Sequence, residues 1–182
     1  NLVDSPGHID FSSDVSTATR LCDGALIVVD VLEGVCSQTH ALLYKALRDR
    51  LNPCLVLNKI DRLITELKLT PLEAFQHIRR VLERVNAVAS TLLLSEIRFK
   101  DDNSNTNLNS KSSNESKTNN NENNENNDGT GNIEDDEDNN PLVQIWNFEP
   151  EKGNVIFCSA FDCWGFSINR FALYWAKKLS LN

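Results

Sequence analysis

The chain has 182 residues, of which 40% are hydrophobic, so its length and apolar content suit one globular domain with its own core. Its formal net charge of −8 is unevenly distributed, because residues 101–140 contain eleven acidic and two basic residues. The remaining residues are close to neutral and contain no cluster of Lys and Arg. The composition therefore gives no support for sequence-specific DNA binding or for a basic surface that holds nucleic acid.

The five cysteines are odd in number and include no Cys-x-x-Cys pair. This pattern argues against a disulfide or zinc framework, and we expect buried thiols at Cys22, Cys36, Cys54, Cys158 and Cys163. No apolar stretch approaches the ~18 to 20 residues that a bilayer span needs. The sequence therefore predicts a cytoplasmic chain without membrane association.

Short apolar runs predict the strands of a sheet. Leu2–Val3 comes first, and the longer runs Ala25–Asp30, Cys54–Leu57 and Val155–Cys158 are apolar on successive residues. Such runs are typical of strands buried on both faces of a parallel sheet.

Apolar residues at helical spacing follow the strands, over residues 43–51, 75–89 and 168–179. The second helix is preceded by Thr-Pro-Leu-Glu at 70–73, which has the residue types of a capping box with Pro at the first helical position. Strands that alternate with helices predict an α/β fold with a doubly wound, mostly parallel sheet.

Residues 101–140 include fifteen Asn and almost no apolar side chains. A segment of this composition cannot bury enough surface to offset its chain entropy, and we expect it to be disordered. We therefore divide the chain into residues 1–100 and 141–182 of one domain, separated by a low-complexity insert at 101–140.

Three polar motifs each follow a predicted strand: Asp-Ser-Pro-Gly-His at 4–8, Asn-Lys-Ile-Asp at 58–61, and Ser-Ala at 159–160. The carboxyl ends of parallel strands share one edge of a sheet, and ligands of such sheets bind there. We expect the three loops to converge on one cleft.

The first motif has the groups that a terminal phosphate and its Mg²⁺ require. Asp4 would hold the metal through water, Gly7 has no Cβ and lets its N–H approach the phosphate, and His8 would orient the attacking water. The same residues also suit an ordinary turn, so this motif alone leaves both interpretations open.

The other two motifs suit recognition of guanine. Asp61 would accept from N1 and the exocyclic amino group, Asn58 would lie near O6 and N7, and the stem of Lys59 would cover the ring. Ala160 would offer its N–H to O6, while Ser159 would brace the loop. An unsatisfied buried carboxylate costs roughly 1 to 3 kcal/mol, so adenine should be rejected.

The stretch 4–11 resembles translational GTPases, which have His after the switch Gly where Ras-like proteins have Gln. Residues 22–39 resemble the elongation factor 2 group. The stretches 58–75 and 159–166 are closer to the elongation-factor-like GTPases of large-subunit maturation than to the translocase.

The resemblance implies a P-loop-type G domain that binds GTP and Mg²⁺, with Pro6 beside Asp4 and Gly7 at the phosphates. It also implies a role in the cytoplasm on the large (60S) ribosomal subunit. There the family releases the anti-association initiation factor together with the Shwachman–Diamond syndrome protein.

The chain departs from the family because it contains no Gly-x-x-x-x-Gly-Lys-Ser/Thr loop and no switch Thr before Asp4. We expect an N-terminally incomplete G domain that, in isolation, folds poorly, binds GTP weakly and is inactive. Two alternatives stay open: an elongation factor 2-like translocase, and a non-catalytic G-domain remnant that serves as a binding module.

Overall fold

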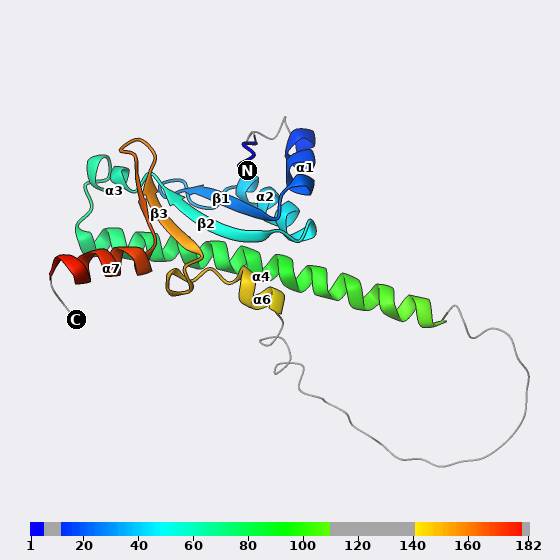
Figure 1. Cartoon of the computed structure of the whole chain (residues 1–182). Helices are drawn as coiled ribbons and strands as arrows, with labels where there is room; N and C mark the ends of the chain where they lie inside the picture. The colour runs from blue at the N-terminus through cyan, green and yellow to red at the C-terminus, as the bar shows by residue number, and fades with distance from the viewer. Residues whose placement is uncertain (6–11, 110–140, 180–182) are drawn as a thin grey trace, which may run out of the picture.

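The computed structural model describes residues 1–5, 12–109 and 141–179, and Figure 1 shows its elements. In chain order these are helix α1 (Ser12–Leu21), strand β1 (Gly24–Asp30), helix α2 (Ser37–Arg48), strand β2 (Asn52–Asn58), helices α3 (Asp61–Thr65), α4 (Pro71–Asn109) and α6 (Pro141–Trp146), the 3₁₀ helix η2 (Pro150–Lys152), strands β3 (Val155–Ser159) and β4 (Trp164–Phe166), and helix α7 (Ile168–Lys178).

The four strands form one sheet in the order β1-β2-β3-β4. The first three are parallel, and β4 runs antiparallel to β3 as the second strand of a hairpin. This mixed α/β architecture confirms the predicted fold class. The register pairs Asp30 with Asn58, so β1 and β2 end at the same level of the sheet edge.

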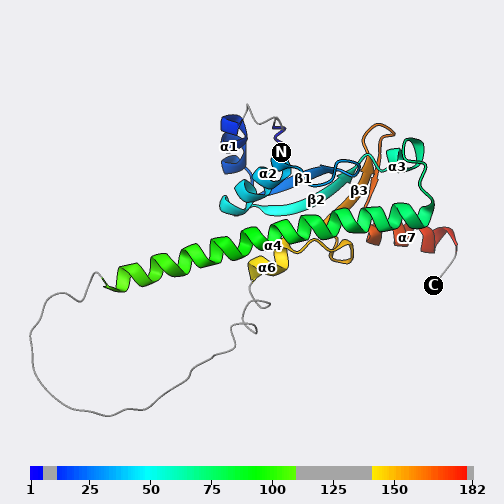
Figure 2. The ribbon, with the colours of Figure 1, turned by 180° about the vertical axis from the view of Figure 1, so that it is seen from behind.

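The hydrophobic core lies between one face of the sheet and the helices α2, α4 and α6. Trp146 and Phe148 are among its largest fully buried side chains. Figures 1 and 2 show α4 running beneath the strands and continuing beyond them. The core thus fixes β1, β2 and β3 relative to one long helix, which positions the edge where these strands end.

Two expectations about the strands are wrong. Leu26 and Val28 of β1 are 59% and 57% exposed, so β1 is buried on one face only. The reason is that α2 and α4 pack on the opposite face, and β1 is the edge strand of the described sheet. Leu2 and Val3 form no strand, and both are exposed.

The expectation of buried thiols is also wrong. All five cysteines are free, but Cys36 and Cys163 are exposed and the other three are only half-buried. The exposed pair lies in the segments that directly precede α2 and β4.

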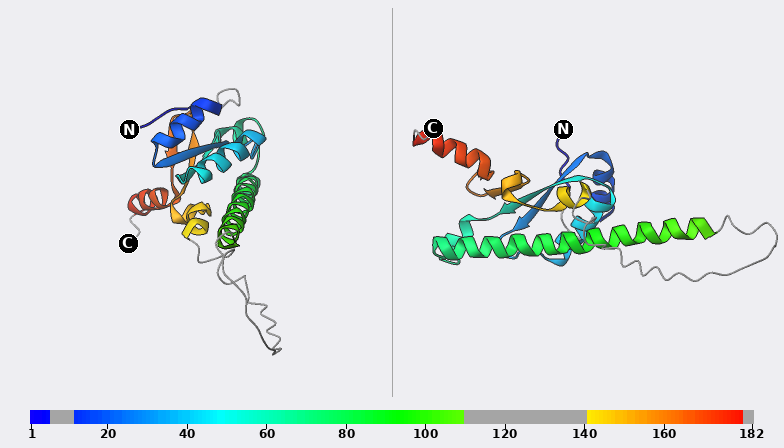
Figure 3. Two further views of the ribbon diagram at one scale, coloured as in Figure 1. Left: turned by 90° about the vertical axis from the view of Figure 1, so that its right-hand side faces the viewer. Right: turned by 90° about the horizontal axis from the view of Figure 1, so that it is seen from below.

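Helix α7 joins the body of the domain through aromatic side chains. The ring of Phe171 stacks on Phe166 of β4 with centroids 4.6 Å apart, and Trp175 continues the series at 6.1 Å from Phe171. Phe171 and Trp175 nevertheless stay 45% and 38% exposed. Figure 3 shows α7 at the margin of the molecule, close to the C-terminus.

The capping box predicted at 70–73 is confirmed. The Thr70 N–H donates to Glu73 Oε2 at 2.9 Å, and the Glu73 N–H donates to Thr70 Oγ1 at 3.4 Å. Helix α4 then runs to Asn109, past the boundary that composition placed at residue 100, and residues 110–140 lie outside the described part. No helix in the described ranges is long and apolar enough to cross a membrane.

Asn86 ties α4 to the segment that enters β3. Its Nδ2 donates to the Phe148 carbonyl and its Oδ1 accepts from the Phe148 N–H, both at 2.9 Å. Phe148 is fully buried, so its backbone groups have little access to water. This pair of bonds connects positions 62 residues apart in sequence.

Replacing Asn86 with Ala should lower the free energy of unfolding by about 2 kcal/mol, because two backbone groups at Phe148 lose their partners. Urea unfolding followed by circular dichroism measures this change. The control is Thr91→Ala on the same helix, whose exposed hydroxyl bonds only to the Ala87 carbonyl and should change stability by less than ~0.5 kcal/mol. Equal effects of the two substitutions would contradict the proposed tie.

Candidate functional site

A cleft lies at the carboxyl ends of β2 and β3. It encloses about 640 Å³, which is within the range of small-molecule sites. Its walls are formed by Asn58, Lys59, Asp61, Arg62, Thr65, Glu66, Ala160, Phe161 and Asp162. These residues come from two segments that lie far apart in sequence: the end of β2 with the start of α3, and the turn after β3. The segments meet because β2 and β3 are parallel neighbours.

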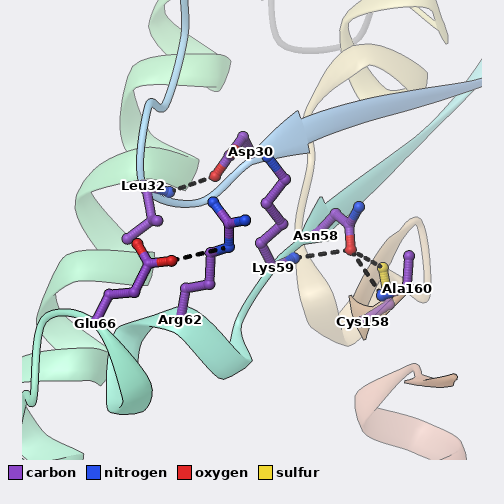
Figure 4. A network of polar contacts seen from close by, with 8 residues as sticks. All are labelled: Asp30, Leu32, Asn58, Lys59, Arg62, Glu66, Cys158 and Ala160. Carbon is purple, nitrogen blue, oxygen red and sulfur yellow. Dashed lines mark hydrogen bonds and ion pairs between the residues drawn. The ribbon is translucent and has the colours of Figure 1, made fainter. Parts of the chain in front are cut away.

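The side-chain oxygen of Asn58 connects the two loops (Figure 4). It accepts hydrogen bonds from the Lys59 N–H at 2.8 Å, the Ala160 N–H at 3.0 Å and the Cys158 thiol at 3.4 Å. Burial raises the pKa of the Cys158 thiol, which favours the protonated form that can donate. One carboxamide oxygen therefore holds both walls of the cleft.

Lys59 leaves the strand in a left-handed backbone conformation, with φ of 65°. A non-Gly residue in this region costs about 1 to 2 kcal/mol, so surrounding contacts must hold it there. Asn58 Oδ1 fixes its N–H, and its Nζ lies 2.5 Å from Asp30 Oδ2 at the end of β1. Asp30 also accepts the Leu32 N–H at 2.9 Å.

The carboxylate of Asp30 is kept ionised by these contacts. Burial would raise its pKa, but the hydrogen bond and charge of Lys59, with the N–H of Leu32, outweigh burial and hold the pKa below its ordinary value. The contribution of the ionised Asp30 carboxylate to stability is therefore present at neutral pH and is lost only as the pH falls through that lowered pKa.

Asp61 opens α3 and has one carboxylate oxygen that no described residue satisfies. Its Oδ1 is buried without a hydrogen-bond partner in the described part of the chain. A buried acceptor left unpaired costs about 1 to 3 kcal/mol, more when it is charged. Such an atom in the wall of a cleft is suited to accept hydrogen bonds from a ligand.

The second wall is braced from beneath by Ser159, which is fully buried. Its Oγ accepts the Asp162 N–H at 3.1 Å and donates to Asp162 Oδ2 at 3.3 Å. These bonds close the turn that carries Phe161, whose ring is 90% exposed.

The structure brings together part of the predicted site. Asn58, Lys59, Asp61 and Ala160 line one cleft, and Ser159 lies under it. The Ala160 N–H, which the sequence assigns to guanine O6, donates to Asn58 Oδ1 in this structure.

The described residues of the first motif, Asp4 and Ser5, are not part of this cleft. Asp4 is exposed and is not one of its lining residues. Pro6, Gly7 and His8 lie outside the described residues. The expected meeting of three loops is thus observed for two, and Asp4 lacks the preceding strand that would have fixed it at the sheet edge.

Sequence reasoning missed Asp30 and Phe161. Asp30 ends the predicted strand 25–30, and Asn58 directly follows the predicted strand 54–57, so the strand-end rule that found the motifs would have found Asp30 too. Phe161 directly follows the Ser-Ala pair, but an exposed aromatic ring on a turn has no sequence signature that separates it from a core residue.

A model of the elongation factor Tu GTP binding domain matches residues 1–177. The chain belongs to this family. Elongation factor-like GTPase 1 of Homo sapiens is 45% identical over 185 residues, covering 100% of this chain and 15% of that protein. Ribosome assembly protein 1 is 44% identical over 181 residues in Schizosaccharomyces pombe and 46% identical over 179 residues in Saccharomyces cerevisiae.

The match places the cleft within a translational GTPase G domain, and this confirms the family predicted from the motifs. The chain spans about 15% of the length of the human and fission-yeast relatives and 14% of the budding-yeast one.

Replacing Asn58 with Ala should lower the free energy of unfolding by roughly 2 to 3 kcal/mol, because three donors lose their shared acceptor. The turn that follows Ser159, whose residues 160–163 are exposed, should also become more accessible to limited proteolysis. Asn52→Ala, at the exposed opposite end of β2, is the control and should change neither property. Unchanged proteolysis in the Asn58 variant would show that the two loops are held independently.

Proposed function

We propose that this chain binds the guanine base of GTP and GDP in the cleft between the Asn58–Asp61 and Ser159–Asp162 loops. The observation that carries the proposal is that Asp61 lines that cleft and that its buried Oδ1 has no hydrogen-bond partner among the described residues. Guanine offers two adjacent N–H donors, at N1 and at the exocyclic amino group, which suit a carboxylate. Adenine has an acceptor at N1 and would leave this oxygen unsatisfied.

The other walls suit the remaining edges of the base. Asn58 uses its oxygen to hold the loops, and its Nδ2 group can donate to N7 or O6. The stem of Lys59 would cover one face of the ring. A contact from the Ala160 N–H to O6 would require that N–H to be shared with Asn58 when nucleotide binds.

Hydrolysis of GTP is proposed for the full-length protein. The 182 residues contain no Gly-x-x-x-x-Gly-Lys-Ser/Thr loop, and hydrolysis needs such a loop to hold the β- and γ-phosphates. This chain would supply Asp4, Pro6 and Gly7 near the phosphates and His8 to orient water. By itself the chain would be inactive. The alternative of a non-catalytic binding module would therefore describe the isolated chain.

For Mg²⁺, the fit of the described residues is limited. Asp4 is one exposed carboxylate, and no cluster of three potential ligands occurs among the described side chains. Mg²⁺ in nucleotide sites is commonly held by one or two carboxylates, water and phosphates. Asp4 would suit the part of a single protein ligand that holds the ion through a water molecule. The ion would neutralise phosphate charge.

We further propose that the full-length protein acts in cytoplasmic maturation of the 60S ribosomal subunit. Two relatives are named ribosome assembly proteins, and this favours maturation over a translocase role. Release of the anti-association initiation factor, with the Shwachman–Diamond syndrome protein as partner, is the specific activity that the resemblance implies.

Replacing Asp61 with Asn tests the base assignment in the full-length protein. The amide can donate to the C2 carbonyl of xanthine, whereas it loses the charged acceptor for guanine. The dissociation constant for GDP should rise about 10- to 100-fold, and that for xanthosine diphosphate should fall. Isothermal titration calorimetry measures both constants.

The control is Asp23→Asn, an exposed carboxylate at the amino end of β1, on the opposite edge of the sheet from the cleft. It should leave both dissociation constants unchanged. Unaltered preference for GDP in the Asp61 variant would remove this residue from base recognition.

A further inference from the structure

We infer that Asp30 is a positioning residue of the cleft, which orients the side chain of Lys59 before any nucleotide binds. The inference rests on the proposed function, because it assigns Lys59 to the face of the base. Asp30 lies on β1, a strand that contributes no lining residue to the cleft. It therefore acts on the ligand only through Lys59.

The register of the sheet explains how the two side chains meet. Asp30 and Asn58 are directly paired at the ends of β1 and β2, and the Val31 N–H donates to the Asn58 carbonyl at 3.0 Å. Lys59 follows Asn58, and its left-handed backbone turns it out of the strand direction. Its ammonium group reaches back to Asp30 Oδ2 at 2.5 Å (Figure 4).

Lys59 is consequently held at both ends. Asn58 Oδ1 fixes its backbone N–H, and Asp30 fixes its Nζ, so the methylene stem between them has few remaining conformations. A free Lys side chain loses much rotamer freedom when it is ordered by a ligand. Fixing the stem in advance removes that cost from binding, which is the general advantage of preorganisation.

The environment of Asp30 suits this role. Its side chain is 15% exposed against 41% for Lys59, so the carboxylate is the sheltered and the ammonium the more solvated partner. The Leu32 N–H orients the carboxylate through its other oxygen, Oδ1. Pairing also neutralises the ammonium charge, so Lys59 presents apolar methylene groups to the base instead of attracting a phosphate group into the base site.

The test is a double-substitution cycle on GDP affinity in the full-length protein, using Asp30→Asn, Lys59→Met and both together. Asn keeps an oxygen for the Leu32 N–H but loses the charge, and Met keeps an apolar stem but loses the ammonium group. Each single variant should weaken GDP binding about tenfold, the size of one charge-assisted contact. The double variant should bind no more weakly than Lys59→Met.

The coupling separates positioning from general destabilisation, because independent structural damage would multiply the two losses. Glu83→Gln, which breaks the exposed Arg79–Glu83 pair on α4, is the matched control and should leave affinity unchanged. Wild-type affinity in Asp30→Asn, or multiplied losses in the double variant, would overturn the inference alone. Failure of the unsubstituted protein to bind GDP would overturn the proposed function and this inference with it.

Discussion

The hydrogen bonds accepted by the side-chain oxygen of Asn58 are the interaction on which the cleft depends. Parallel pairing brings the ends of β2 and β3 together, but it does not fix the loops that follow them. Asn58 does so by accepting from the residue after it and from Cys158 and Ala160 across the sheet. An amide is well suited here because its oxygen can accept several donors while its nitrogen stays able to donate.

This tie also accounts for the unusual state of Asp61. The short helix α3 begins two residues after Lys59 and its left-handed backbone, and its first residue, Asp61, lines the cleft. With the loops fixed, Asp61 Oδ1 is buried but has no partner among the described residues. The described part of the fold thus leaves this acceptor unsatisfied, and a ligand with paired N–H donors is the simplest group to satisfy it.

Much of the fold and site follows from local sequence patterns. The runs at 25–30, 54–57 and 155–158 form strands because β-branched and apolar residues pack well in a sheet, and the box at 70–73 caps α4 as predicted. The strand-end rule located the residues of both observed loops. Leu2–Val3 was wrongly predicted as a strand. A strand forms only where it pairs with a neighbouring strand, and an apolar run of two residues does not show whether such a neighbour is present.

Other features depend on contacts that pattern reasoning cannot supply. Leu26 and Val28 are exposed on one face of β1 because no helix of the described core packs on that face. The apolar run at 25–30 by itself predicts burial on both faces. The antiparallel strand β4 is only three residues long, below the length at which alternation is informative. The Ala160 N–H was assigned to a ligand because its competing acceptor, Asn58 Oδ1, is distant in sequence.

Hydrogen–deuterium exchange of the full-length protein, with and without GDP, tests the central claim most directly. The claim predicts that saturating GDP slows exchange in the peptides covering both residues 58–66 and residues 158–164, and that ADP at the same concentration slows neither. Binding of GDP without protection of these two segments would contradict a guanine site between the ends of β2 and β3.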